Sequence, residues 1–163
     1  MGRGRAPFLL GFLISAGALA VAVLYFQRHL GLEPCPLCIF QRVAVMAAGV
    51  LFLVGLLHGP KGGIRRLYGL LLTLTTLGGI AIAARHLWLQ YGPHEEALGC
   101  GPGLEYMLET MPLHEVVRDV LEGTGDCGEI LWTLAGISIP GWTALLLLVL
   151  LGLSLVILFG RDR

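Results

Sequence analysis

Charged residues are scarce in this sequence. They make up 13% of its 163 residues, whereas hydrophobic residues make up 56%, and the mean hydropathy is +0.81. A soluble globular domain has about 25% charged residues, so that class is excluded. The formal net charge is zero, which gives no sign of the concentrated basic face that nucleic-acid binding requires. We therefore expect a membrane protein that has no nucleic-acid partner and lies in the lipid bilayer.

Four long apolar runs divide the chain. They cover residues 8–26, 39–57, 67–84 and 141–159. Each is close to the roughly 20 residues that a helix needs to cross the hydrocarbon core of a bilayer, and a helix satisfies its own backbone there. The sequence shows no soluble domain and no internal repeat, and it predicts one membrane domain, residues 1–163, that is all-α and built as a four-transmembrane-helix bundle. The spans are expected at about 8–26, 39–57, 67–91 and 140–160.

Lys and Arg residues near the span ends are unevenly distributed. Seven of them fall on one side: Arg3, Arg5, Lys61, Arg65, Arg66, Arg161 and Arg163. The opposite side holds Arg28 and Arg118. Because cytoplasmic connections carry the excess of Lys and Arg, both termini are expected in the cytoplasm. The connections at about 27–38 and 92–139 then lie outside it.

A different interpretation of the N-terminus stays open. The Ala-Leu-Ala of residues 18–20 follows a basic start and an apolar core, as a signal-peptide cleavage site does. The apolar run continues to Phe26, beyond the point where such a signal ends. This continuation favours an uncleaved first span, whereas cleavage would leave three spans and place the C-terminal arginines outside.

All four cysteines lie in the two exterior connections, which suits a compartment where disulfides persist. For Cys100 and Cys127, a structural disulfide that closes the interval between them would stabilise the fold by about 3 to 4 kcal/mol. A bridge between Cys35 and Cys38 closes almost no loop, so stability does not explain that pair.

The Cys35 and Cys38 pair opens the second apolar run in the sequence PCPLC. The positive end of a helix lowers a thiol pKa and favours the thiolate, so a redox role is preferred. Ile39 follows the pair where c-type haem attachment requires His. A four-thiolate zinc site usually uses two close doublets, and Cys100 and Cys127 are far apart. No metal is therefore expected.

Three polar residues lie close to the exterior ends of the second and third runs. Arg42 follows Cys38 by four positions and shares its helical face, where it could stabilise a thiolate or hold a carbonyl oxygen; the alternative is snorkelling to the interface. His86 and Gln90 also share a face, and their alternative is an interfacial position without chemistry. All three are candidate site residues.

An amphipathic helix is expected within the long third connection, at PLHEVVRDVLEG (residues 112–123). One face is apolar: Leu113, Val116, Val117, Val120 and Leu121. We expect this short helix to lie at the membrane interface between Cys100 and Cys127. It either keeps those thiols near the bilayer or is a loop helix with no transport role.

The motifs together resemble the DsbB family, the quinone-dependent disulfide-generating membrane proteins of bacteria. The likeness covers nearly the whole chain: four spans, PCPLCIFQR opening the second, RHLWLQ ending the third, single cysteines in the long loop, and GDCGEILW then IPGW before the fourth. The resemblance implies a multi-pass protein of the bacterial inner membrane with its cysteines on the periplasmic face. It also implies a thiol oxidoreductase.

By this resemblance, Cys35 and Cys38 would pass electrons to ubiquinone or menaquinone, with Cys38 nearest the quinone ring. Cys100 and Cys127 would form a shuttle disulfide. A periplasmic thioredoxin-fold dithiol oxidase of the DsbA kind would attack Cys100, and Cys127 would exchange with Cys35.

The resemblance also implies a quinone site. Arg42 and His86 match family quinone-site positions, and Gln90 is a plausible third member. Ile139 stands at a neighbouring position that carries Met in some family members.

Two other functions are weighed against this one. A thiol oxidoreductase of the vitamin K epoxide reductase type also couples cysteine pairs to a quinone, but its Cys-x-x-Cys follows the loop cysteines, and the order here is reversed. A membrane protein whose exterior disulfides are only structural is the second alternative. Cycling of Cys35 and Cys38 between thiol and disulfide would distinguish it.

Overall fold

The computed structural model describes residues 4–92, 104–122 and 130–160. Its main elements are seven helical segments and a two-stranded antiparallel hairpin. They are α1 (Ala6–Ala20), η1 (Val21–His29), α2 (Pro36–His58), α3 (Gly62–Tyr91), α4 (Leu104–Thr110), α5 (Leu113–Glu122), β1 (Thr133–Leu134), β2 (Ile137–Ser138) and α7 (Ile139–Phe159). Cys100 and Cys127, together with Arg3, Arg161 and Arg163, lie outside the described residues.

Four helices are long and apolar enough to cross a membrane, which confirms the expected fold class. They are Ala6–His29, Pro36–His58, Gly62–Tyr91 and Ile139–Phe159. Most of each helix surface faces away from the protein, and leucines and valines cover it. Such surface is stable in lipid and costly in water. The helices also run beyond the apolar runs: at 30 residues, α3 is about 45 Å long, more than the roughly 30 Å of the hydrocarbon core.

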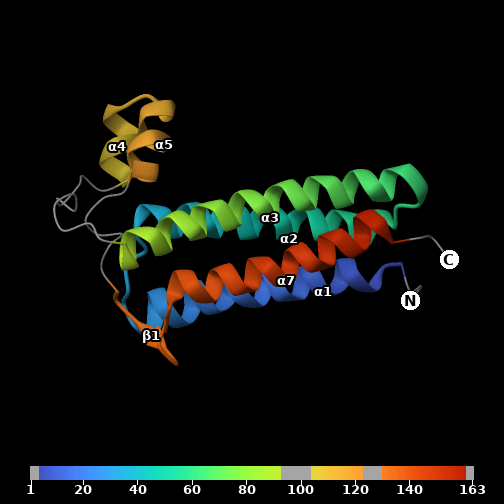
Figure 1. The fold of residues 1–163 in the computed structure, drawn as a ribbon, viewed down its shortest axis with the longest axis horizontal. Coiled ribbons are helices and arrows are strands. Elements are labelled where there is room, and N and C mark those ends of the chain that lie inside the picture. Colours follow the sequence, from blue (N-terminus) through green and yellow to red (C-terminus); the bar gives the residue numbers. More distant parts are fainter. Residues whose placement is uncertain (1–3, 93–103, 123–129, 161–163) are drawn as a thin grey trace.

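The four helices form a ring in which α1 packs on α2, α2 on α3, and α3 on α7. The contact between α1 and α7 closes the ring and is smaller than the other three. The turn from α2 to α3 is tight because Gly59 ends α2 with a left-handed backbone, φ +59°. Figure 1 shows this turn and both termini at one end of the bundle, and α4, α5 and β1 at the other. The described residues of the long third connection, in α4, α5 and the hairpin, therefore lie at the end where α2 begins.

Close packing within the bundle depends on glycines that face aromatic rings. A Cβ atom on Gly11 would lie 2.5 Å from the ring of Phe52, and one on Gly55 would overlap the ring of Phe8. Both phenylalanines are fully buried in the bundle core. Small residues at helix contacts allow this approach, which supplies the dispersion energy that holds helices together in lipid.

The amphipathic loop helix is present as α5, and it uses part of its apolar face inside the protein. Val116 and Val120 are fully buried against Leu37 at the start of α2 and Leu89 near the end of α3. Met107 of α4, a helix that the sequence analysis did not predict, completes this second cluster. The α4–α5 pair therefore packs on the ends of α2 and α3, next to the cysteine pair.

The glycine contacts generate a stability prediction. Gly55→Ala forces a methyl group into the Phe8 ring, and overpacking of this kind costs about 1–3 kcal/mol. Gly78→Ala in α3 is the matched control, because nothing lies within 4 Å of its Cβ position and alanine favours a helix over glycine by about 1 kcal/mol. Thermal unfolding in detergent should show a lower Tm for Gly55→Ala and an unchanged or higher one for Gly78→Ala. Equal Tm values would contradict the packing described.

Candidate active site

The cysteine pair is built into the first turn of α2. Cys35 is the N-cap residue with an extended backbone, and Pro36 occupies the first helical position. The backbone N–H of Cys38 donates to Sγ of Cys35 at 3.3 Å, and the Cys35 thiol donates to Sγ of Cys38 at 3.0 Å. A thiolate on Cys35 would thus be stabilised by a backbone N–H and by the positive end of the helix. An approach of about 1 Å would bring the two sulfurs to disulfide distance.

His86 on α3 lies beside this pair. Its Nε2 atom is 3.7 Å from Sγ of Cys35, and its Nδ1 atom is 3.0 Å from the side-chain amide nitrogen of Gln41. Only 1% of His86 and 3% of Gln41 is exposed. When the amide donates to Nδ1, the ring carries its proton on Nε2, which faces the Cys35 sulfur. The buried amide therefore holds the imidazole in this orientation, and with its nitrogen toward Nδ1 it leaves the ring proton on Nε2.

The sequence analysis did not select Gln41, although it follows Cys38 by three positions and therefore shares its helical face. The available signal was a second polar residue, next to Arg42, in an apolar run. Its importance becomes visible only when α2 packs on α3.

Arg42 connects α2 to the first span. Its guanidinium donates to Oε1 of Gln27 at 2.9 Å and to the backbone carbonyl of Ala22 at 3.2 Å. Both acceptors belong to η1, a π-helical continuation of α1. The side chain thus has hydrogen-bond partners within the protein, whereas snorkelling would direct it to the interface.

Gln90 is fixed at the other end of the site. Its Oε1 atom accepts a hydrogen bond of 2.8 Å from the hydroxyl of Ser138, the buried residue that precedes α7. This bond joins α3 to the N-terminal end of α7. Gln90 lies one turn beyond His86 on the same helix, as the sequence predicted.

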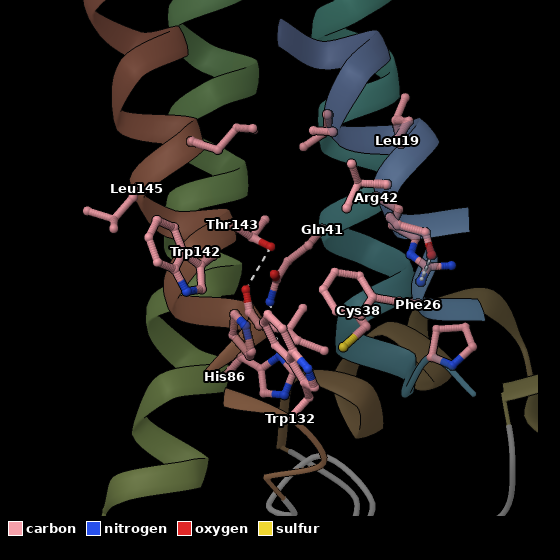
Figure 2. Close-up of a pocket in the computed structure, with 18 of the residues that line it drawn as sticks. Leu19, Phe26, Cys38, Gln41, Arg42, His86, Trp132, Trp142, Thr143 and Leu145 are labelled. Atoms are coloured by element: carbon pink, nitrogen blue, oxygen red, sulfur yellow. Dashed lines mark hydrogen bonds between the residues drawn. The ribbon is translucent and has the colours of Figure 1, made fainter. Parts of the chain in front are cut away.

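A cavity of about 680 Å³ brings these residues together. Cys35, Cys38, Arg42, His86 and Gln90 all contribute to its wall, as does Ile139. Figure 2 shows Cys38 and Arg42 on one side of this space and Trp142 and Leu145 on the other, and the side chain of Gln41 reaches between them toward His86. Of the predicted site residues, the structure therefore gathers the five that it describes around one space.

The cavity is largely apolar, with its polar groups concentrated near the cysteines. Aromatic side chains form part of the wall, and the rings of Phe26 and Trp132 meet edge to face with centroids 4.9 Å apart. The volume lies within the roughly 300–1,000 Å³ of small-molecule sites. The volume and the lining suit a small, largely apolar molecule that carries a few hydrogen-bonding atoms at the cysteine end.

Comparison with known proteins supports the resemblance found in the sequence. The family described as "Disulfide bond formation protein DsbB" matches residues 4–157. "Disulfide bond formation protein B" of Marinobacter nauticus is 49% identical over 157 residues, which cover 96% of this chain and 93% of the relative. Proteins with the same name from Xanthomonas campestris pv. campestris and Methylococcus capsulatus are 55% and 46% identical, over 85% and 98% of this chain and 81% and 96% of their own lengths.

The matches extend across all four spans and include both ends of the candidate site, from Cys35 on α2 to Ile139 at the start of α7. The relatives are matched over most of their own length as well, so the likeness concerns whole proteins. The chain belongs to the DsbB family of disulfide bond formation proteins.

Proposed function

We propose that this chain reoxidises a periplasmic thioredoxin-fold dithiol protein of the DsbA kind and passes the electrons to a membrane quinone, ubiquinone or menaquinone. The observation that carries the proposal is the position of Cys38 and Cys35: they begin a transmembrane helix and line an apolar cavity at the same time. A disulfide on the water side and an oxidant dissolved in lipid can both reach such a pair.

The relay consists of three two-electron exchanges. The partner's dithiol reduces the Cys100–Cys127 disulfide and leaves as a disulfide. The Cys100 and Cys127 thiols then reduce the Cys35–Cys38 disulfide, with Cys127 attacking Cys35. Finally the Cys35 and Cys38 thiols return to a disulfide and give two electrons and two protons to the quinone, which becomes a hydroquinone. Each thiol exchange proceeds through attack by a thiolate.

The residues around Cys35 suit the middle exchange. When Cys127 attacks the sulfur of Cys35, Cys38 leaves as a thiolate and a mixed disulfide of Cys127 and Cys35 forms. Cys35 becomes the leaving group when Cys100 attacks Cys127 and resolves this mixed disulfide, and a thiolate leaves more readily when it is stabilised. The N–H of Cys38 and the Nε2 side of His86 face this sulfur. The amide of Gln41 holds His86 in that orientation.

The long connection approaches the same place. Cys35 packs against the cluster that contains Val116 and Val120 of α5. Cys127 follows Glu122, the last residue of α5, by five positions. Five residues span at most about 18 Å, so the covalent chain keeps the loop thiol within a short search distance of the end of α5.

The cavity fits a quinone head group. A quinone can accept the two electrons that the dithiol must give up to become a disulfide. The rings of Phe26, Trp132 and Trp142 offer apolar contact to a planar ring, and His86 and Arg42 place donors near the end where its carbonyl oxygens would lie. The cavity wall includes Leu13 of α1 and Val149 of α7, and both are about half exposed on the outer surface. A lipid-soluble molecule could therefore enter between α1 and α7.

We also propose the orientation in the membrane. Lys61 and Arg66 lie at the end of the bundle that holds both termini, opposite the cysteine pair. The excess of Lys and Arg marks the cytoplasmic side. The cysteine end then faces the periplasm of a bacterial inner membrane.

The first test is anaerobic reduction of an added quinone, followed by its absorbance, when the purified protein meets a reduced thioredoxin-fold dithiol partner. We expect rapid reduction by the parent chain and none by Cys38→Ala or Cys100→Ala, because each variant interrupts the relay at a different exchange. Thr75→Ala, which changes a partly exposed residue of α3 that is not among the cavity-lining residues, is the control for sample handling and should behave as the parent. Undiminished quinone reduction by Cys38→Ala would refute the proposed electron path.

A second test concerns Arg42. A lysine keeps the charge but lacks the planar fork that donates to Gln27 and Ala22 at once. Loss of one hydrogen bond from a charged group costs about 1.5–3 kcal/mol, so Arg42→Lys should lower kcat/KM for the quinone by about tenfold or more. Arg66→Lys, an exposed change at the opposite end, should leave it unchanged. An unchanged kcat/KM for the quinone in Arg42→Lys would show that Arg42 does not act in the quinone site.

A further inference from the structure

Three metal-ligating atoms converge at the start of α2. Sγ of Cys35, Sγ of Cys38 and a ring nitrogen of His86 all lie within 4.8 Å of one another. The two sulfurs are 3.0 Å apart, and Nε2 of His86 is 3.7 Å from Sγ of Cys35. In tetrahedral zinc sites, bond lengths of about 2.3 Å to sulfur and 2.0 Å to nitrogen separate two sulfurs by about 3.8 Å and a sulfur from a nitrogen by about 3.5 Å. Nε2 of His86 is already near that spacing from Sγ of Cys35, and the sulfurs need to separate by less than 1 Å.

The surroundings of His86 resemble those of a metal ligand. A metal-bound imidazole usually donates its other ring N–H to a fixed acceptor, which sets the tautomer and the orientation of the ring. The side-chain amide of Gln41 is 3.0 Å from Nδ1, and both residues are buried. Rotation of the amide by half a turn would present its oxygen to an Nδ1–H. Gln41 can therefore bond to either neutral tautomer of His86. In the tautomer with the proton on Nδ1, Nε2 has the lone pair that can bind a metal ion.

We propose that the reduced Cys35–Cys38 pair and His86 form a binding site for a thiophilic divalent ion of the Zn²⁺ and Cd²⁺ kind. Two thiolates and one imidazole are a donor set that these ions prefer. Binding converts two thiols to metal-bound thiolates and releases two protons. Three protein ligands leave a fourth position for water from the adjoining cavity, as in exchangeable rather than structural zinc sites.

The site exists only in the reduced chain, because a disulfide has no thiolate to offer the ion. A bound ion would hold Cys35 and Cys38 as thiolates and keep them from reforming a disulfide. If the proposed function holds, thiophilic ions would therefore block quinone reduction reversibly. The binding itself requires neither a quinone nor a thiol partner.

This proposal departs from the sequence-based expectation of no metal. That expectation considered a site made from four cysteines. His86 lies 51 positions after Cys35, and only the packing of α3 on α2 brings its ring to the sulfurs.

The test uses the full chain with Cys100→Ser and Cys127→Ser, so that Cys35 and Cys38 supply all its thiols. The reduced protein is titrated anaerobically with Cd²⁺ in detergent, and the ultraviolet thiolate-to-metal absorption is followed; Zn²⁺ is then added as a competitor. We expect one ion and two released protons per chain. The same chain with the Cys35–Cys38 disulfide formed is the matched control and should bind no ion. Equal binding by the oxidised chain would overturn the site.

Variants identify the third ligand. Gln41→Leu should weaken Zn²⁺ binding by roughly 10- to 100-fold, the usual effect of removing the partner of a ligating histidine, and His86→Ala should weaken it more. His114→Ala, which changes an exposed histidine on α5, should bind Zn²⁺ as the parent does. Parent-like affinity in His86→Ala would show that the two thiolates act without the imidazole and would refute the three-ligand site. If His86→Ala fails to fold, Gln41→Leu still tests the imidazole through its effect on the affinity for Zn²⁺, and the comparison of reduced and oxidised chains tests the thiolates. Loss of quinone reduction would affect neither result.

Discussion

The first turn of α2 is the constraint on which the site depends. A serine or aspartate at an N-cap usually accepts the orphan backbone N–H groups of a helix, and here the acceptor is the sulfur of Cys35. Because Pro36 fixes the first helical residue, both sulfurs are held on the same side of the turn. The positive end of a transmembrane helix is thus directed at the atom that has to carry negative charge during exchange. In the proposed function, the same turn lies at the end of the bundle where water and lipid meet, so its position also selects the reactants.

The structure protects this turn from two directions. On the water side, α4 and α5 cover Leu37 and Leu89 with buried valines and Met107. On the lipid side, Trp142 closes part of the cavity wall, and its indole N–H donates to the carbonyl of Leu134 in the hairpin. Even with this cover, Cys35 and Cys38 remain half-buried and not fully enclosed. Access from the water side thus depends on α4 and α5, and access from the lipid side depends on Trp142 of α7 and on the hairpin that its indole contacts.

The sequence predicted the parts of this arrangement that arise from local patterns. Apolar runs predicted the four spans, the alternation of apolar and charged residues predicted α5, and helical spacing placed Arg42 near Cys38 and Gln90 near His86. The hairpin was missed because its turn has Ala135 at φ +54° where Asn or Gly usually gives the signal.

Other features depend on tertiary contacts that no local pattern shows. The π-helical segment η1 is apolar and reads as an ordinary continuation of α1. Within its helix Gln41 shows only as a second polar residue beside Arg42, because its function comes from the Nδ1 atom of His86, 45 positions away.

Arg42 illustrates how the cavity and its chemistry depend on each other. A cation placed toward the centre of a bilayer costs about 2.5–3.5 kcal/mol on insertion scales, and hydrogen bonds to Gln27 and to the carbonyl of Ala22 offset part of that cost. Those bonds hold η1 against α2, and η1 supplies Phe26 to the cavity wall. Arg42 therefore also helps to set the position of Phe26 in the cavity wall. A substitution that removed only the charge of Arg42 would also weaken the bonds that hold η1, and so would alter the shape of the cavity. Electrostatic and packing effects at this position therefore change together.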